Sequence, residues 1–356
     1  MKNILVVFGG DSSESEVSVM SAIEGMEAIP FVDYKVFPAY VKNGKWYTGE
    51  ELKSVKTYLN FNEKKAQRIT LIGKDLYFLK GKRWKYLSTM DCALLFTHGG
   101  NGENGVLQGY LEMQGLPYTS SGVYGSALTM DKWATKTLAK ECGIDVVKGM
   151  LISNNCPENE EILQKSIGYP MFIKPNTQGS SIGVGKAVDK ATFEERVKNA
   201  FLYDKDVLVE KCIENGVEYN CAVLGVGERI IVSEVEKVIS ANDFLSFEDK
   251  YISNESKTEK ECPANISEAL RTEIKVKTSE IYQKLHLKGV VRFDFIFKDK
   301  LYLNEINNIP GSLANHLFLG CSYGELLSLI IDDAIDRGIE SSKEFTSQIL
   351  TQGKKK

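Results

Sequence analysis

The sequence lacks the features that mark several large classes of protein. It contains no apolar run approaching the roughly 20 residues that would span a bilayer, and it has no internal repeat or low-complexity tract. The net charge is −4 and the pI is about 5.7, so there is no basic excess that would favour a nucleic acid or a membrane surface. We therefore expect a protein with neither a nucleic-acid nor a membrane partner.

Paired cysteines are also missing. The seven cysteines are scattered, odd in number, and include no Cys-x-x-Cys pair. This pattern favours free thiols in a reducing compartment over a disulfide framework or a zinc site. The N-terminal stretch MKNILVVFGG is too short for a signal peptide and is typical of a first strand. We therefore expect a cytoplasmic location.

What remains is the composition of an ordinary globular protein, with 43% apolar and 26% charged residues over 356 positions, enough for two or three domains. Strand-like and helix-like segments alternate: ILVVFGG precedes a helix that Ser12 or Ser13 could cap, and CALLFTHGG precedes the helical VLQGYLEMQG. A further helix is expected over 126–142. The alternation predicts an open α/β sheet whose ligands lie beyond the carboxyl ends of its strands.

The segment 291–311, VRFDFIFKDKLYLNEINNIPG, is the most informative part of the chain. It is typical of two strands joined by a polar turn. Because side chains alternate across a strand, Arg292 and Asp294 share one face, as do Glu305 and Asn307. Antiparallel pairing would bring two carboxylates, an amide and a guanidinium together, and such oxygen ligands suit Mg²⁺ bound together with substrate phosphates. The alternative is an edge hairpin with a solvated polar face.

Two upstream segments favour the metal-site interpretation. In IKPNTQGSSIGVGK (173–186), Lys174 precedes a loop of glycines and serines, whose small residues let backbone N–H groups approach phosphate oxygens. In VLVEKCI (207–213), an apolar strand ends at Glu210, where backbone and carboxylate could meet an adenine or a ribose. Taken alone, the first segment is equally compatible with a glycine-rich hairpin turn, and the second is better explained as a strand that simply reaches solvent.

Taken in chain order, Lys132, the Lys174 loop, Glu210 with Lys211, and the hairpin resemble the layout of the ATP-grasp carboxylate–amine ligases, and among them the D-alanine–D-alanine ligase family. Four further segments are similar to motifs of that family over nearly the whole chain. FGGDSSESEVS resembles its GG-x-S-x-E-x-EVS signature, THGGNGENGVLQG its HG-x-x-GEDGT-x-QG segment, LPYTSSGVYGSALTMDK its PYTGSG-x-x-ASA-x-x-MDK segment, and FEDKYIS a loop ending in Lys-Tyr.

The resemblance implies a role for each matching residue. ATP-binding roles fall on Lys132, Lys174, Gly179, Ser181, Gly183, Glu210, Lys211, Ile213, Glu218 and Lys250. Two Mg²⁺ ions, or Mn²⁺ in their place, would be held by Asp294, Glu305 and Asn307. Catalytic and first-substrate roles fall on Glu14, Ser180, Tyr251, His98 and Arg292. Of these, Glu14 would hold the substrate ammonium through a link to Ser180 and Tyr251, His98 would lie near the first carboxylate, and Arg292 would steady an oxyanion. The acceptor would lie against Gly311, His316 and Leu317.

One segment departs from the family pattern. Where members usually have PG-(F/M)-T-x-x-S, this chain reads PGSLANHL (310–317), without the threonine and serine hydroxyls. Asn104 also stands where the family has Asp, and Leu245 where a loop tyrosine is common. The 310–317 segment leaves two interpretations open: a neutral rewording in which backbone N–H groups hold the acceptor, or a changed acceptor.

The resemblance implies a three-domain ATP-grasp architecture: an N-terminal open parallel sheet (1–120), two ATP-clamping α+β subdomains (121–209 and 210–345), and a tail (346–356). It also implies small-molecule substrates, a homodimer, and a loop over 240–253 that closes on the site. The expected function is ATP-dependent ligation of D-alanine to a second amino acid, D-alanine first, through an acyl phosphate, for peptidoglycan precursor synthesis. The alternatives are another acceptor, such as D-serine, and a nucleotide-binding protein that has lost ligation.

Overall fold

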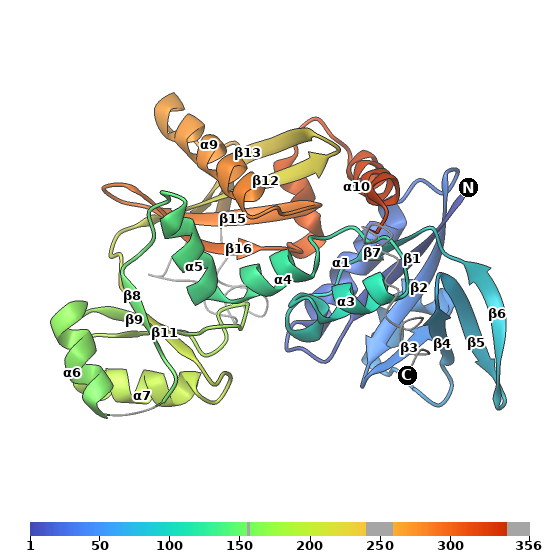
Figure 1. Cartoon of the computed structure of the whole chain (residues 1–356), viewed down its shortest axis with the longest axis horizontal. Helices are drawn as coiled ribbons and strands as arrows, with labels where there is room; N and C mark the ends of the chain where they lie inside the picture. The colour runs from blue at the N-terminus through green and yellow to red at the C-terminus, as the bar shows by residue number, and fades with distance from the viewer. Residues whose placement is uncertain (155–156, 240–258, 340–356) are drawn as a thin grey trace, which may run out of the picture.

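The computed structural model of the chain describes residues 1–154, 157–239 and 259–339, and it arranges them around three β-sheets (Figure 1). The expected Lys250 and Tyr251, together with Leu245, the loop 240–253 and the tail 346–356, lie outside these described residues. Among the described residues, none of the helices has the length and apolar character needed to cross a membrane.

The N-terminal sheet has seven strands in the order β6-β5-β4-β3-β2-β1-β7. They are β1 (Lys2–Gly9), β2 (Tyr34–Lys42), β3 (Lys45–Thr48), β4 (Gln67–Ile72), β5 (Asp75–Lys80), β6 (Arg83–Thr89) and β7 (Cys92–Leu95). The predicted parallel pairing holds for β1 with β2 and with β7, whereas β3 to β6 extend the sheet by antiparallel hairpins. Residues 4–8 are fully buried, as expected for a parallel strand covered on both faces.

Helices from both ends of the chain cover this sheet (Figure 1). They are α1 (Ser15–Ala28), α3 (Val106–Met113) and α10 (Tyr323–Arg337), with η1 (Glu50–Lys53), α2 (Lys56–Leu59) and η2 (Gly100–Gly102) in the connections. The prediction that Ser12 or Ser13 caps α1 was wrong, because Glu14 occupies the N-cap position. The Ser12 hydroxyl instead donates to the carbonyl oxygen of His98 at 2.5 Å and so ties the helix start to the loop after β7.

The helix expected over 126–142 is two helices, α4 (Val123–Met130) and α5 (Lys132–Glu141). They separate at Asp131, whose extended backbone lets its carboxylate accept a hydrogen bond from the Ala134 N–H at 2.8 Å. Lys132 is therefore the first residue of α5, and Lys136 lies one turn further on the same face.

The second sheet has four strands in the order β10-β9-β11-β8. Its elements are β8 (Gly149–Ile152), α6 (Pro157–Ser166), β9 (Met171–Pro175), β10 (Gly185–Ala187), α7 (Lys190–Ala200) and β11 (Val207–Lys211). Apolar side chains of α6 and α7, including Leu163, Phe193 and Val197, pack against one face. Because side chains alternate, Lys174 and Glu210 project from the other face.

The third sheet has five strands in the order β14-β13-β12-β15-β16. Its elements are β12 (Val217–Val226), β13 (Arg229–Ile239), β14 (Glu259–Glu261), α9 (Glu268–Lys284), β15 (Val290–Phe297) and β16 (Leu301–Asn307), followed by η3 (Gly311–Leu317). The predicted hairpin over 291–307 is confirmed. Its Phe293 and Phe295 are fully buried in the core beneath α9, so the polar residues take the opposite face.

Candidate active site

The hairpin of β15 and β16 brings the predicted polar residues together. Asp294 lies directly opposite Glu305, and Arg292 opposite Asn307, in the antiparallel register. Arg292 donates from Nε and Nη2 to the two oxygens of Asp294 at 2.7 and 2.8 Å, and Asn307 Nδ2 donates to Asp294 Oδ2 at 2.9 Å. Burial alone would lower the pKa of Arg292, but the Asp294 charge raises it, so the guanidinium keeps its charge.

A β-bulge in this hairpin re-aims one more side chain. The register passes from the Asp294–Glu305 pair to the Phe295–Leu303 pair, which leaves Asn304 without an opposite residue. Asn304 Oδ1 accepts a hydrogen bond from Lys174 Nζ at 3.1 Å. The bulge therefore links the hairpin of β15 and β16 to the second sheet.

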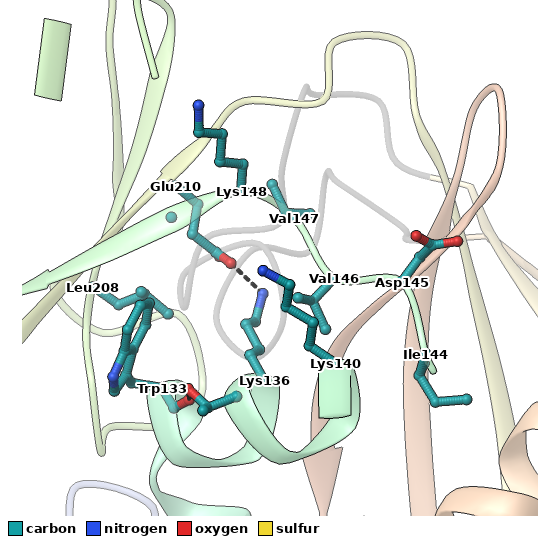
Figure 2. Close-up of a pocket in the computed structure, with 12 residues that line it drawn as sticks. Trp133, Lys136, Lys140, Ile144, Asp145, Val146, Val147, Lys148, Leu208 and Glu210 are labelled. Carbon is teal, nitrogen blue, oxygen red and sulfur yellow. Dashed lines mark hydrogen bonds and ion pairs between the residues drawn. The ribbon is translucent and has the colours of Figure 1, made fainter. Parts of the chain in front are cut away.

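Glu210 on β11 lies between two buried lysines, Lys174 on the neighbouring strand β9 and Lys136 on α5. Its carboxylate forms ion pairs with Lys174 Nζ at 2.6 Å and with Lys136 Nζ, and Figure 2 shows Lys136 directed at Glu210. Burial alone would raise the pKa of Glu210, but the two lysine charges lower it below its usual value. Burial lowers the pKa of Lys136 to about 8. A cavity of about 230 Å³ lies beside this group, lined also by Trp133 and Lys140.

Glu14 meets the glycine loop of the second sheet. The Ser180 hydroxyl donates to Glu14 Oε1. Two glycines make room for this carboxylate, because a Cβ added to Gly179 or to Gly99 would come within 2.6 Å of Glu14 Oε2. Gly99 also has a φ of +65°, which favours glycine on its own. The predicted link between Glu14 and Ser180 is thus present in the geometry.

A small cavity of about 40 Å³ lies where these segments converge. Its lining combines residues from the N-terminal segment, α5, the glycine loop and the hairpin: Glu14, Glu103, Lys132, Gly179, Glu305 and Asn307. Lys132 Nζ donates to the Gln178 carbonyl oxygen at 2.5 Å, and burial lowers the pKa of Lys132. Residues more than 290 positions apart therefore surround one volume.

His98 connects the loop after β7 to α1, and Glu103 connects the same loop to the segment before η3. His98 is buried, its Nε2 lies 3.2 Å from Ser21 Oγ, and burial lowers its pKa to about 4, so the ring is neutral at pH 7. Glu103 accepts hydrogen bonds from the N–H groups of Gly99 at 2.9 Å and Ile309 at 3.1 Å. Burial raises the pKa of Glu103 to about 7.

The predicted acceptor segment forms η3, and its backbone is unusual. Ser312, Leu313 and Ala314 have φ values of +43°, +51° and +49°, a left-handed turn built without glycine. The Ser312 N–H donates to Ser21 Oγ at 3.1 Å, which holds the turn against α1. Leu317 is fully buried in the core, so only its backbone could meet a ligand.

The remaining predicted residues are spread around this centre. Lys211 Nζ donates to the carbonyl oxygens of Gly168 and Tyr169 at 3.2 and 2.8 Å, so its side chain ties down the start of β9. Glu218 on β12 lies opposite Ile296 on β15, so it stands beside the hairpin. The other predicted residues lie in connecting segments: Ser181 and Gly183 are in the glycine loop and both have positive φ. Ile213 follows β11, and Gly311 begins η3.

Four polar residues of this region were not predicted from the sequence: Glu103, Lys136, Asn304 and Glu236. The four-residue spacing of Lys132 and Lys136 on one helix could have identified Lys136. Glu103 lies in THGGNGENGVLQG, so the likeness of that segment to the family motif could have identified it. Asn304 depends on a bulge, and Glu236 on β13 is paired with His316, 80 positions away, so no local pattern marks these two.

Among the described residues, no three His, Cys, Asp or Glu side chains form a cluster able to hold a metal by themselves. The hairpin instead offers two carboxylates and one amide. The Asp294 carboxylate accepts hydrogen bonds from Arg292 and Asn307. These leave part of its acceptor capacity for a metal ion, because a carboxylate has about four lone-pair sites. This donor set fits an ion such as Mg²⁺ that completes its coordination with water and phosphate oxygens.

The comparisons with known proteins agree with this geometry. The sequence profile described as "D-ala D-ala ligase N-terminus" matches residues 3–121, and "D-ala D-ala ligase C-terminus" matches residues 138–330. The D-alanine--D-alanine ligase of Thermosipho melanesiensis is 41% identical over 97% of this chain and 95% of its own length, and that of Thermosipho africanus is 37% identical over 99% and 97%.

Solved structures give the same answer. The VanG D-Ala:D-Ser ligase from Enterococcus faecalis superimposes with a TM-score of 0.80 at 29% identity, covering 94% of this chain and 99% of that one. The D-alanine–D-alanine ligase from Helicobacter pylori gives a TM-score of 0.78 at 28% identity, covering 94% and 98%. The expected ATP-grasp fold is confirmed, and the chain belongs to the D-alanine–D-alanine ligase family.

Proposed function

We propose that this protein joins D-alanine to a second amino acid, D-alanine by preference, while converting ATP to ADP and phosphate, and that the product serves peptidoglycan precursor synthesis. The observation that carries the proposal is the convergence of Glu14, Lys132, Gly179 and Glu305 on one cavity. That cavity combines a carboxylate for an ammonium group, a cation for phosphate and a carboxylate for a metal.

In the proposed reaction, the carboxylate of the first D-alanine must become a better electrophile before the amine of the acceptor can attack it. Lys132 and Lys174 would hold the ATP phosphates and neutralise charge while the acyl phosphate forms. Asp294, Glu305 and Asn307 would hold Mg²⁺, which supplies charge neutralisation to the transferring phosphoryl group when bound. Glu210, fixed by Lys136, would contribute to the nucleotide pocket.

Glu14 would hold the ammonium group of the first amino acid. The Ser180 hydroxyl, which donates to the Glu14 carboxylate, would keep that carboxylate in place. Arg292, already oriented by Asp294, would stabilise the oxyanion that develops when the acceptor amine attacks. The support for this role is its rigid placement, because a donor that needs no reorganisation stabilises a transition state most effectively.

The test is to incubate the protein with ATP, Mg²⁺ and D-alanine, follow ADP release, and identify the product by mass spectrometry. Parallel reactions would pair D-alanine with each other D- and L-amino acid. ADP together with D-alanyl-D-alanine at the highest rate supports the proposal. Turnover only with another pair would reassign the acceptor, and ATP binding without any turnover would overturn the ligase activity.

Glu305→Gln should shift the Mg²⁺ dependence of turnover to higher concentration, because an amide replaces a charged ligand while the shape of the side chain is kept. The measurement is turnover against Mg²⁺ concentration at saturating ATP and D-alanine. Glu259→Gln, an exposed change on β14, is the matched control and should leave the titration unaltered. An unaltered titration in Glu305→Gln itself would mean that the hairpin does not hold the metal.

A further inference from the structure

Glu236 on β13 is a buried carboxylate that the proposed reaction does not use. It is 1% exposed. Its Oε2 accepts a hydrogen bond from His316 Nε2 at 2.8 Å, and its Oε1 accepts one from Asn220 Nδ2 at 3.0 Å. Lys260 Nζ lies 3.5 Å from Oε1. A buried charge is retained only where partners compensate its desolvation. Glu236 therefore keeps its charge by binding these three side chains.

The position of Glu236 in the sheet connects it to the reaction centre. Asn220 on β12 is opposite both Glu236 on β13 and Asp294 on β15, and Asp294 is opposite Glu305 on β16. One polar row thus crosses four strands, from the proposed metal ligands to His316. Asn220 is 4% exposed, and among the residues that the structure describes its Oδ1 has no hydrogen-bond partner.

His316 is the point where this row meets the acceptor segment. Its side chain is 43% exposed, although Nε2 is bound to Glu236. The left-handed turn at 312–314 precedes it, and the Ser312 hydroxyl donates to Glu24 at 2.5 Å, so the turn is fixed to α1. The imidazole is therefore held at Nε2 by Glu236, while the side chain as a whole is partly exposed.

The chemistry of the ring defines what it can bind. An imidazole whose Nε2–H is donated to Glu236 can bind a second carboxylate only when Nδ1 also carries a proton. The ring then bridges two carboxylates, one from the protein and one from a ligand, and both hydrogen bonds are charge-assisted. Burial alone would raise the pKa of Glu236, but His316, Lys260 and Asn220 lower it to about 2, so this acid remains ionised.

We propose that Glu236 is a positioning residue that holds His316 against the carboxylate of the acceptor amino acid, so that the pair selects acceptors with a free carboxylate. This inference rests on the proposed ligase function and deepens it. It assigns to the altered 310–317 segment a charged contact in place of hydroxyl groups. Lys260 is 47% exposed and lies further from Glu236, so His316 is the partner that carries the selection.

A competition experiment tests this pairing. The wild-type protein receives ATP, Mg²⁺, D-alanine and D-alaninamide together. D-alaninamide has no carboxylate to activate, so it can act only as an acceptor. With the two acceptors at equal concentration, the ratio of D-alanyl-D-alanine to D-alanyl-D-alaninamide, read by mass spectrometry, reports the ratio of kcat/KM for the two acceptors. It is independent of how much active protein is present.

We expect the wild-type protein to favour D-alanine, and His316→Gln to reduce the product ratio by about ten- to hundredfold, the effect of losing one hydrogen bond to a charged group. Glu236→Gln should reduce the ratio in the same direction, and the double variant should fall no further than His316→Gln, because Glu236 acts through His316. Lys260→Gln is the control and should leave the ratio within about twofold, as expected for a partly exposed charge.

The outcomes separate the two proposals. If the wild-type protein makes dipeptide but the ratio is unchanged in His316→Gln, the acceptor carboxylate lies elsewhere, and this inference is overturned while the ligase function stands. If Glu236→Gln lowers turnover without changing the ratio, Glu236 only supports the fold, and its positioning role is overturned. If the wild-type protein forms neither product, the ligase function itself fails.

Discussion

Arg292→Ala should reduce turnover by about two to three powers of ten, the usual effect of removing one oxyanion donor. The guanidinium is bound at 2.7 and 2.8 Å to Asp294, so its position and charge are fixed before substrate arrives. In the proposed mechanism, removing it takes away the charge that would stabilise the oxyanion when the acceptor amine attacks. The measurement is steady-state turnover at saturating substrates, with ATP affinity measured separately.

Arg292→Lys is the informative companion variant. It keeps the positive charge but loses the two-point contact with Asp294, so its turnover should lie between those of wild type and Arg292→Ala. ATP affinity should change little in either variant. A loss of less than tenfold in Arg292→Ala would remove this residue from the proposed oxyanion role.

Glu210→Gln should cost about 3–5 kcal/mol of stability, because breaking a buried ion pair leaves uncompensated charge. The side chains of Lys136 and Lys174 are only 4% and 6% exposed, and the Glu210 carboxylate lies between them. Without it, two buried ammonium groups would face each other. The measurement is urea unfolding of the ligand-free protein at pH 7, where the wild-type carboxylate is ionised.

Two further variants decide whether charge is the cause. Adding Lys136→Met to Glu210→Gln removes one of the two cations and should recover much of the lost stability. Glu214→Gln, whose side chain is 52% exposed and paired with Lys186, should change stability by no more than about 1 kcal/mol. A cost below 1 kcal/mol for Glu210→Gln would mean that water or a shift of the lysines compensates the charge.

The hairpin at 291–307 was predictable from the sequence because its chemistry follows the two-residue period of a strand. Arg292 with Asp294 obeys this period, and buried Phe293 confirms it from the other face. Asn304 could not be predicted, because a bulge breaks the period and only the pairing with β15 reveals it. The family resemblance supplied the order of the motifs, but not how their side chains pair.

Other features depend on contacts that a local pattern does not contain. The division between α4 and α5 was missed because the sequence around Asp131 has no proline or glycine. The aspartate, which is favoured at an N-cap and disfavoured inside a helix, was the available signal. The pairing of Glu236 with His316 joins positions 80 residues apart. Such pairings are fixed by sheet register, which the sequence of one strand does not determine.

Helix α10 has a consequence for how the chain acquires its structure during synthesis. Its Leu326, Leu327, Ile330 and Ile331 complete the core of the N-terminal sheet, and Asp332 binds Lys2 Nζ at 2.9 Å. In a ribosome-bound chain that ends before residue 323, α10 is missing. The face of the N-terminal sheet that α10 covers is then exposed, and it is apolar. Exposed apolar surface of this kind makes a folding intermediate prone to association. The first sheet to be synthesised is thus completed only when α10 has been made, and we expect the nascent chain to expose apolar surface until then.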